Sequence, residues 1–303
     1  MAKINYAKYM ADFTPQKEWV EGKGIFIIIA FFTGGIAGGL YLMSLLQDFF
    51  LGALLAYLIV MVIKFPAHML FLGHPFRFWR LLWRPNSSWI SRTMYFEMMF
   101  SIFPALQLIG WASQKYTFMH ALLGFVPWAG VYPILSALAI LAAFGMIIGT
   151  GFIIAGATGV PAWNTTLVPV LMLAYSFLGG TGLILLISPA LGEGAVNLAA
   201  VETFARWLLG VTAFIVLVYL WTVYYAGPAA QKSVKDLFKG RVASVFIPGV
   251  LILGLLIPIV VLSIGVVSHV APVVIAITAL CELIGGFSMR YSLIKAGVFA
   301  PLV

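Results

Sequence analysis

Residues 244–267 read SVFIPGVLILGLLIPIVVLSIGVV, a stretch without a single charged side chain. A helix needs about 20 predominantly apolar residues to cross a bilayer, so this stretch predicts a membrane span. The whole chain is of the same kind, because 63% of its 303 residues are hydrophobic, 9% are charged, and the mean hydropathy is +1.10. We predict an all-α integral membrane protein with eight transmembrane helices, at residues 24–47, 50–72, 93–112, 130–155, 165–187, 204–226, 244–267 and 270–289.

The first 23 residues carry seven charges and contain no apolar core. A cleavable signal peptide has a basic start followed by an apolar segment. The sequence therefore predicts no such peptide, and we expect the first helix to act as its own insertion signal.

Basic residues are concentrated in the segments that eight spans place on one side of the membrane. Of the 17 basic residues, 15 belong to this side: Lys3, Lys8, Lys17, Lys23, Lys64, Arg77, Arg80, Arg84, Arg92, Lys232, Lys235, Lys239, Arg241, Arg290 and Lys295. The opposite side carries Lys115 and Arg206 together with Asp48, Glu193 and Glu202. Cytoplasmic segments retain Lys and Arg, so we expect both termini in the cytoplasm. The net charge of +8 then indicates topology and contact with anionic membrane lipids, not binding to nucleic acid.

The chain has few ligands for metal centres. It contains one cysteine, Cys281, whereas an iron-sulfur cluster needs several thiolates and a disulfide needs two. Two haems would need four axial ligands in pairs across helices, but His68 and His74 lie toward the inner face and His120 and His269 toward the outer face. We therefore predict no metal site, no haem and no iron-sulfur cluster in this chain, and any cluster would belong to a partner.

Residues 71–92 read FLGHPFRFWRLLWRPNSSWISR and interleave arginine with aromatic residues between two predicted spans. This pattern predicts a docking face at a membrane surface. The segment, in which Gly73, His74 and Pro75 close one span, resembles the NrfD/polysulfide reductase membrane-subunit family. Two further elements are similar to that family: a glycine-rich first helix at residues 34–41, with a weaker echo at 178–183, and Pro-x-Trp-Asn before helix five, here residues 161–164. In the first helix, small residues also favour close helix packing.

The resemblance implies two four-helix bundles, which we place at residues 24–155 and 156–289, between an N-terminal tail (1–23) and a C-terminal tail (290–303) in the cytoplasm. It also implies a membrane anchor that exchanges two electrons and protons with menaquinone or ubiquinone. The implied partners are an iron-sulfur electron-transfer subunit and a molybdopterin catalytic subunit. These would dock from the cytoplasm on the loop at 73–92, with Arg77, Arg80 and Arg84 facing an acidic surface.

Glu97 is the first candidate for chemistry, because charged residues within spans are rare and usually functional. It lies about one turn inside the third span, where a carboxyl group could exchange protons with quinol. The alternative is an ion pair with Lys64 or Arg92 that only holds the bundle together. His68 could form a hydrogen bond with a quinone carbonyl, or be an ordinary interfacial histidine. If the quinone site lies beside the docking face, as the resemblance implies, it comprises Trp19, His68, Arg92, Tyr95, Glu97 and Asn164.

Three positions depart from the family. Members with a described quinone pocket have polar side chains early in helix one and a tyrosine before a glycine on helix four. This chain has Ile27 and Ala30 at the first positions and Gly149 at the last. Either other groups hold the quinone, or the pocket is lost and the subunit is a structural anchor.

A third possibility is a secondary transporter or ion-translocating subunit, which would use broken helices and midplane charges. Pro104, Pro133 and Pro258 could interrupt helices, and Glu97 with Glu282 could relay ions. Glu282 could equally form a structural pair with Arg290 or a neighbouring helix. The residues do not distinguish polysulfide, sulfur, sulfite, tetrathionate or formate as the terminal substrate, nor the direction of electron flow.

Overall fold

The computed structural model describes residues 13–191, 194–268 and 270–300. Lys3, Lys8, Glu193 and His269, on which part of the topology and haem arguments rest, lie outside this range. Within it the regular secondary structure is helical apart from two strands of two residues each, β1 (Thr14–Pro15) and β2 (Val298–Phe299). The all-α class is therefore confirmed, with one small addition at the chain ends.

The helices follow one another with short connections. In chain order they are η1 (Lys17–Trp19), α2 (Gly24–Leu46), α3 (Phe50–Leu58), η2 (Ile59–Lys64), α4 (Phe65–Phe71), η3 (Pro75–Trp83), α5 (Trp89–Lys115), α6 (Thr117–Leu123), α7 (Trp128–Ala155), α8 (Leu167–Ile187), η4 (Ser188–Ala190), α9 (Leu198–Tyr225), α10 (Pro228–Phe238), α11 (Ala243–Val245), η5 (Phe246–Leu256), α12 (Ile257–Val267) and α13 (Pro272–Ala296). The segments η2 and η5 are π-helical, whereas η1, η3 and η4 are 3₁₀-helical.

Seven helical stretches in the described chain are long and apolar enough to cross a membrane. These are Gly24–Leu46, Phe50–Phe71, Trp128–Ala155, Leu167–Ala190, Leu198–Tyr225, Ala243–Val267 and Pro272–Ala296. The sequence predicted eight, and the remaining one corresponds to α5. This helix has 27 residues, but its apolar character is diluted because it carries Arg92, Glu97 and Gln107.

The last helix is longer than predicted. We expected the final span to end at residue 289 and Arg290 to begin a cytoplasmic tail. Instead α13 continues to Ala296, and Arg290 is fully buried within it. The side chain is held there because its guanidinium donates to the Gly286 carbonyl at 3.1 Å and to Ser176 Oγ at 3.2 Å.

Helices α2 and α8 pack closely through their two glycine-rich stretches. A Cβ atom added at Gly39 would collide with the backbone of Ser176, and one added at Gly180 would collide with the backbone of Gly39 and Leu40. Because glycine has no side chain, the two backbones can approach to this distance. The packing role predicted for the glycines of the first helix is confirmed, and the weaker echo at 178–183 is its contact partner.

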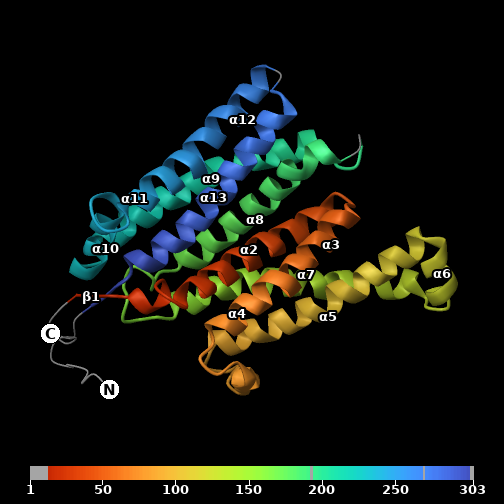
Figure 1. Cartoon of the computed structure of the whole chain (residues 1–303), viewed down its shortest axis with the longest axis horizontal. Helices are drawn as coiled ribbons and strands as arrows, with labels where there is room; N and C mark the ends of the chain where they lie inside the picture. Colours follow the sequence, from red (N-terminus) through yellow and green to blue (C-terminus); the bar gives the residue numbers. More distant parts are fainter. Residues whose placement is uncertain (1–12, 192–193, 269, 301–303) are drawn as a thin grey trace.

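Figure 1 shows α2 to α7 in one half of the molecule and α8 to α13 in the other, with α8 beside α2. Within the first half α5 packs along α7, and within the second half α13 packs on α8 and η5. The division into two four-helix bundles at residues 155 and 156 stays a prediction.

The two ends of the described chain meet. Strands β1 and β2 pair antiparallel, and the backbone N–H of Gln16 donates to the Gly297 carbonyl at 3.2 Å. The loop between α7 and α8 joins them, because Trp163 Nε1 donates to the Leu293 carbonyl at 2.9 Å and the Ala300 N–H donates to the Gly159 carbonyl at 2.9 Å. This junction places the start of α2 and the end of α13 at the same end of the molecule.

Candidate functional site

A cavity of about 370 Å³ lies where α2, α4, η3 and α5 meet, with η1 and α7 completing its wall. Ligand pockets of 300 to 1,000 Å³ typically have apolar walls and a few polar groups. This cavity fits that description, because most of its lining side chains are aliphatic or aromatic. The lining residues are Trp19, Ile27, Phe31, Phe65, His68, Met69, Phe71, Leu72, Phe78, Leu81, Ile90, Thr93, Met94, Glu97 and Ile153.

A charge cluster of three side chains, Lys64, His68 and Glu97, adjoins the cavity. Lys64 Nζ forms an ion pair with Glu97 Oε1 and lies 3.4 Å from His68 Nδ1, and the same Nδ1 lies 3.9 Å from Glu97 Oε2. The side chains of Lys64 and Glu97 are 1% and 8% exposed. His68 and Glu97 line the cavity, whereas Lys64 is not among the lining residues.

The local sequence explains why the cluster forms here. Lys64 ends the π-helical segment η2, and His68 follows one turn later on α4, so both face the same side of the helix. Pro66 comes just after η2. A proline has no N–H to donate and disrupts regular helical bonding, and π-helical turns commonly occur at functional sites. Across the interface, a Cβ atom at Gly34 would collide with the alkyl chain of Lys64. Gly34 therefore provides the space that Lys64 occupies.

Three of the six residues predicted to form a quinone site, Trp19, His68 and Glu97, line this cavity. The ion-pair alternative for Glu97 is also realised, with Lys64 as the partner. The two interpretations are therefore compatible, because one carboxylate oxygen can pair with Lys64 while the group still borders the cavity.

Arg92 and Tyr95 are not among the lining residues. The Arg92 guanidinium donates to the carbonyls of Pro85 at 2.6 Å and Asn86 at 2.7 Å, and its Cζ lies 4.6 Å from the centre of the Trp89 ring. The Tyr95 hydroxyl donates to the Leu82 carbonyl at 2.9 Å. Both side chains lie near the start of α5 and donate hydrogen bonds to the backbone of η3 or of the turn that follows it.

Asn164 also lies outside the lining. Its amide Nδ2 donates to the Ala155 carbonyl at 2.6 Å, which satisfies one of the free carbonyls at the end of α7. The neighbouring Trp163 packs edge-on against Trp19, with ring centres 5.4 Å apart. Asn164 therefore belongs to the loop that supports one wall of the cavity.

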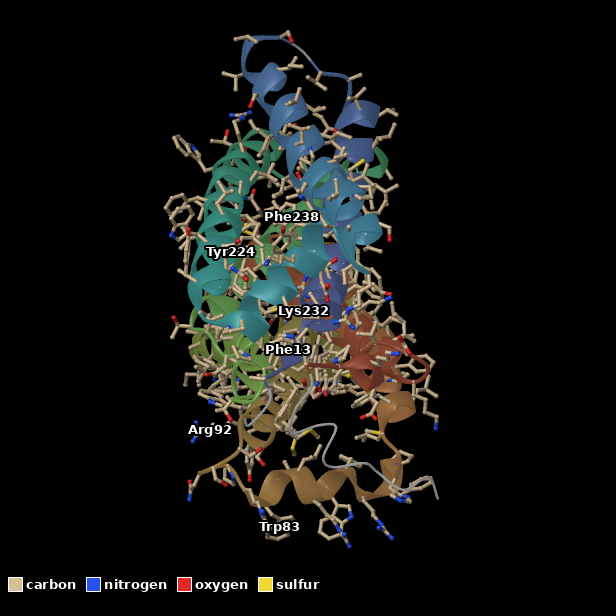
Figure 2. All side chains as sticks on the ribbon, turned by 90° about the vertical axis from the view of Figure 1, so that its left-hand side faces the viewer. Phe13, Trp83, Arg92, Tyr224, Lys232 and Phe238 are labelled. Atoms are coloured by element: carbon tan, nitrogen blue, oxygen red, sulfur yellow. The ribbon has the colours of Figure 1, made fainter. Side chains whose placement is uncertain are left out.

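The predicted docking arginines lie on or next to η3. Phe78 and Leu81 of this helix line the cavity, while Phe76 and Trp83 are 93% and 73% exposed. Figure 2 shows Trp83 at the edge of the molecule, pointing away from the helices. Arg77, Arg80 and Arg84 are exposed, and the sequence has no acidic residue between Asp48 and Glu97, so this segment contributes only basic charge to the surface.

The positions that depart from the family have apolar or tight surroundings. Ile27 lines the cavity and Ala30 is fully buried. A Cβ atom at Gly149 would meet the side chain of Thr93, and Thr93 itself lines the cavity. The titratable groups of this cavity thus come from α4 and α5. From the sequence, Lys64 was interpreted as a topology signal and as a possible partner of Glu97 but not as a site residue, although a lysine inside a predicted span was the available signal.

A second group of buried polar side chains lies between α8 and α13. Both carboxylate oxygens of Glu282 are buried without a hydrogen-bond partner in the described chain, as are the Tyr175 hydroxyl and Arg290 Nε. The structural pair that Glu282 could have formed with Arg290 is absent from the ion pairs of the described residues. Among those same residues, no group of three His, Cys, Asp or Glu side chains could hold a metal ion.

These features define a class: a polytopic helical membrane protein with an apolar cavity that ends at a buried charge cluster, next to a basic helix. The family can be stated as well. A family model described as "Polysulphide reductase, NrfD" matches residues 23–301, and the chain belongs to that family. It is a multi-pass membrane subunit of polysulphide reductase-type complexes. A comparison with curated proteins finds no match to the chain.

Proposed function

We propose that this subunit binds quinone or quinol in the cavity and exchanges two electrons and protons between the membrane quinone pool and a cluster-bearing partner. The observation that carries the proposal is the cavity itself, whose apolar walls end at His68 and Glu97. A quinone has an apolar tail and a ring with two polar oxygens. Apolar walls suit the tail, and the two titratable side chains suit the ring oxygens.

The proposed chemistry divides between two subunits. Oxidation of one quinol releases two electrons, which pass to the iron-sulfur clusters of the partner, and two protons, which the Glu97 carboxylate can take up one after the other because it borders the cavity. Reduction of quinone reverses each transfer. The quinone performs the redox chemistry, while this chain binds it and exchanges its protons.

We place the partner on the face that carries η3 and the chain ends. The proposed partner is an iron-sulfur electron-transfer subunit joined to a molybdopterin catalytic subunit, with Arg77, Arg80 and Arg84 as docking residues. Figure 2 looks onto the end of the molecule that carries Phe13, Lys232 and Arg92. The excess of Lys and Arg at this end supports a cytoplasmic location for it and for both termini. A tagged N-terminus accessible to protease outside the cell would contradict this orientation.

We also propose that α5 crosses the membrane, giving eight spans. The pairing of β1 with β2 supports an even number of crossings, since both chain ends meet. Seven stretches qualify by composition, so one more is needed. With 27 residues at 1.5 Å per residue, α5 is about 40 Å long, which exceeds the hydrocarbon core of about 30 Å.

The test is purification through a tag on this chain in a gentle detergent, followed by identification of the copurified subunits and quinol-dependent reduction of their clusters. We expect cluster reduction that a quinone analogue blocks. Partners without any response to quinol would indicate a structural anchor, and purification of the chain alone would favour a transporter.

Two substitutions tie the activity to the cavity. Glu97→Gln should lower quinol-dependent reduction about 100-fold or more, the usual contribution of a positioned acid or base. His68→Gln should lower it about 10-fold, through the loss of one hydrogen bond to the ring oxygen. Copurification should persist, because in Glu97→Gln the new amide oxygen would still accept a hydrogen bond from Lys64. The matched control is Glu282→Gln, which changes a buried carboxyl group outside the cavity and should leave the rate unchanged.

A further inference from the structure

We propose that Lys64 is a positioning residue that holds His68 in the tautomer carrying its hydrogen on Nε2, so that the cavity offers a hydrogen-bond donor to its ligand. One consequence, that the cavity prefers a ligand with a ring carbonyl, rests on the proposed function. The tautomer itself can be tested without any assay of activity.

The tautomer of His68 follows from which of the neighbouring groups can donate a hydrogen bond. An ammonium group has three donors and no acceptor. Lys64 Nζ lies 3.4 Å from His68 Nδ1, so in a hydrogen bond between them Nδ1 must be the acceptor. A neutral imidazole with a bare Nδ1 carries its hydrogen on Nε2.

The competing tautomer has a weaker partner. With the hydrogen on Nδ1, the ring would have to donate to Glu97 Oε2. That oxygen lies 3.9 Å away, beyond the range of a hydrogen bond from nitrogen to oxygen. The geometry therefore favours the contact with Lys64 over the contact with Glu97.

Lys64 is itself held rigidly. It is buried, paired with Glu97 from α5, and lies 5.4 Å from the centre of the Phe65 ring. Helix α2 faces it with Gly34, which leaves space for the alkyl chain. The titratable groups that face Lys64 are thus Glu97 and His68. With one hydrogen directed at each, the ammonium fixes the carboxylate and the imidazole together.

The consequence concerns the ligand. Since His68 lines the cavity and its Nδ1 is engaged by Lys64, Nε2–H is the donor left for a bound molecule. A quinone ring offers carbonyl oxygens that only accept hydrogen bonds, so it is complementary to this donor. In Lys64→Met, Glu97 loses its partner and becomes the acceptor available to Nδ1–H. The tautomer should then reverse, leaving a bare Nε2 opposite the carbonyl.

The experiment is ¹⁵N NMR of the purified chain labelled on histidine, which is feasible because the sequence has only four histidines. His68→Gln assigns the signals by their loss. We expect wild-type His68 to be neutral with a bare Nδ1 and a protonated Nε2, and we expect Lys64→Met to exchange the two. A wild-type His68 with hydrogen on Nδ1, or on both nitrogens, would overturn the proposal, as would an unchanged tautomer in Lys64→Met.

Lys64→Arg is the matched control, since it keeps a cationic donor and should keep the tautomer. If Lys64→Met fails to fold, the wild-type spectrum alone still decides. The functional measurement is the affinity of the purified complex for a quinone analogue. In Lys64→Met the loss of one neutral hydrogen bond should weaken this affinity about 10-fold. An analogue that does not bind the wild-type complex would count against the proposed function, while the tautomer would stand or fall on the spectra.

Discussion

Two buried carboxyl groups, Glu97 on α5 and Glu282 on α13, have opposite surroundings. Glu97 is paired with Lys64, lies near His68 and borders the cavity. Glu282 is at least as buried, but within the described chain its oxygens have no hydrogen-bond partner. By sequence both are ionisable residues within spans, which are often functional, and the sequence favoured Glu97 for chemistry and a structural pair for Glu282. The difference indicates that burial alone does not mark a candidate site, and that a charged partner and an adjoining cavity distinguish Glu97 from Glu282.

The largest expected effect is that of Glu97→Leu. Removing one member of a buried ion pair leaves Lys64 uncompensated, which typically costs about 3 to 5 kcal/mol. We expect a strongly lowered unfolding temperature in detergent and loss of quinol-dependent cluster reduction. In the double variant Lys64→Met/Glu97→Leu, stability should largely return because the cluster then holds no buried charge, but turnover should not. Wild-type stability of the single variant would show that the pair contributes little.

The matched substitution Glu282→Leu should act in the opposite direction. A buried polar group without a hydrogen bond costs about 1 to 3 kcal/mol, and replacing it with an apolar side chain removes that cost. We expect an unfolding temperature equal to or above that of the wild type, with unchanged turnover. A marked loss of turnover would instead indicate that Glu282 takes part in proton or ion movement. Both buried carboxyl groups would then be functional.

Trp163→Phe tests whether the loop after α7 supports the cavity. The substitution removes the hydrogen bond from Nε1 to the Leu293 carbonyl, which should cost about 1 kcal/mol. It also loosens the contact with Trp19, so binding of a quinone analogue should weaken by a few fold while the partner subunits still copurify. Phenylalanine at an exposed tryptophan far from this loop, such as Trp207, is the control. Equal affinity for the analogue in both variants would show that this loop does not support the cavity.

The smallest effect is expected for Tyr95→Phe, which removes a partly exposed hydrogen bond to the Leu82 carbonyl. We expect a change of about 0.5 kcal/mol in stability and nearly full turnover, because Tyr95 is not in the lining of the cavity. The measurement is the rate of quinol-dependent cluster reduction. A large drop in that rate would bring Tyr95 back into the quinone site, where the sequence alone had placed it.

The sequence predicted the membrane spans well because each depends on local composition. One helix end shows where composition fails. Arg290 was assigned to a tail although it is buried inside α13. A hydrogen bond to Ser176 of α8 helps to make this charged side chain tolerable within the bundle, and a sequence window does not contain that neighbouring helix. The span predicted at residues 93–112, which corresponds to α5, stays a prediction.

The candidate site was predicted in part. Trp19, His68 and Glu97 come from three different segments and line one cavity, as their common predicted depth suggested. Arg92, Tyr95 and Asn164 have the same predicted depth, yet their polar groups bind nearby backbone carbonyls. Depth can be counted along a helix, but the direction in which a side chain points around the helix depends on packing.

By itself, the sequence determined that this protein is a helical membrane protein with a strongly basic end, and it carried the motifs of its family. These properties follow from hydrophobicity, charge and short motifs, which act locally. Only the tertiary structure decided that Lys64, His68 and Glu97 form one cluster, that Gly34 makes space for it, and that Glu282 has no hydrogen-bond partner within the described chain. The physical reason is that the pairing of buried charges depends on contacts between helices far apart in the chain, and those contacts exist only after the helices have packed.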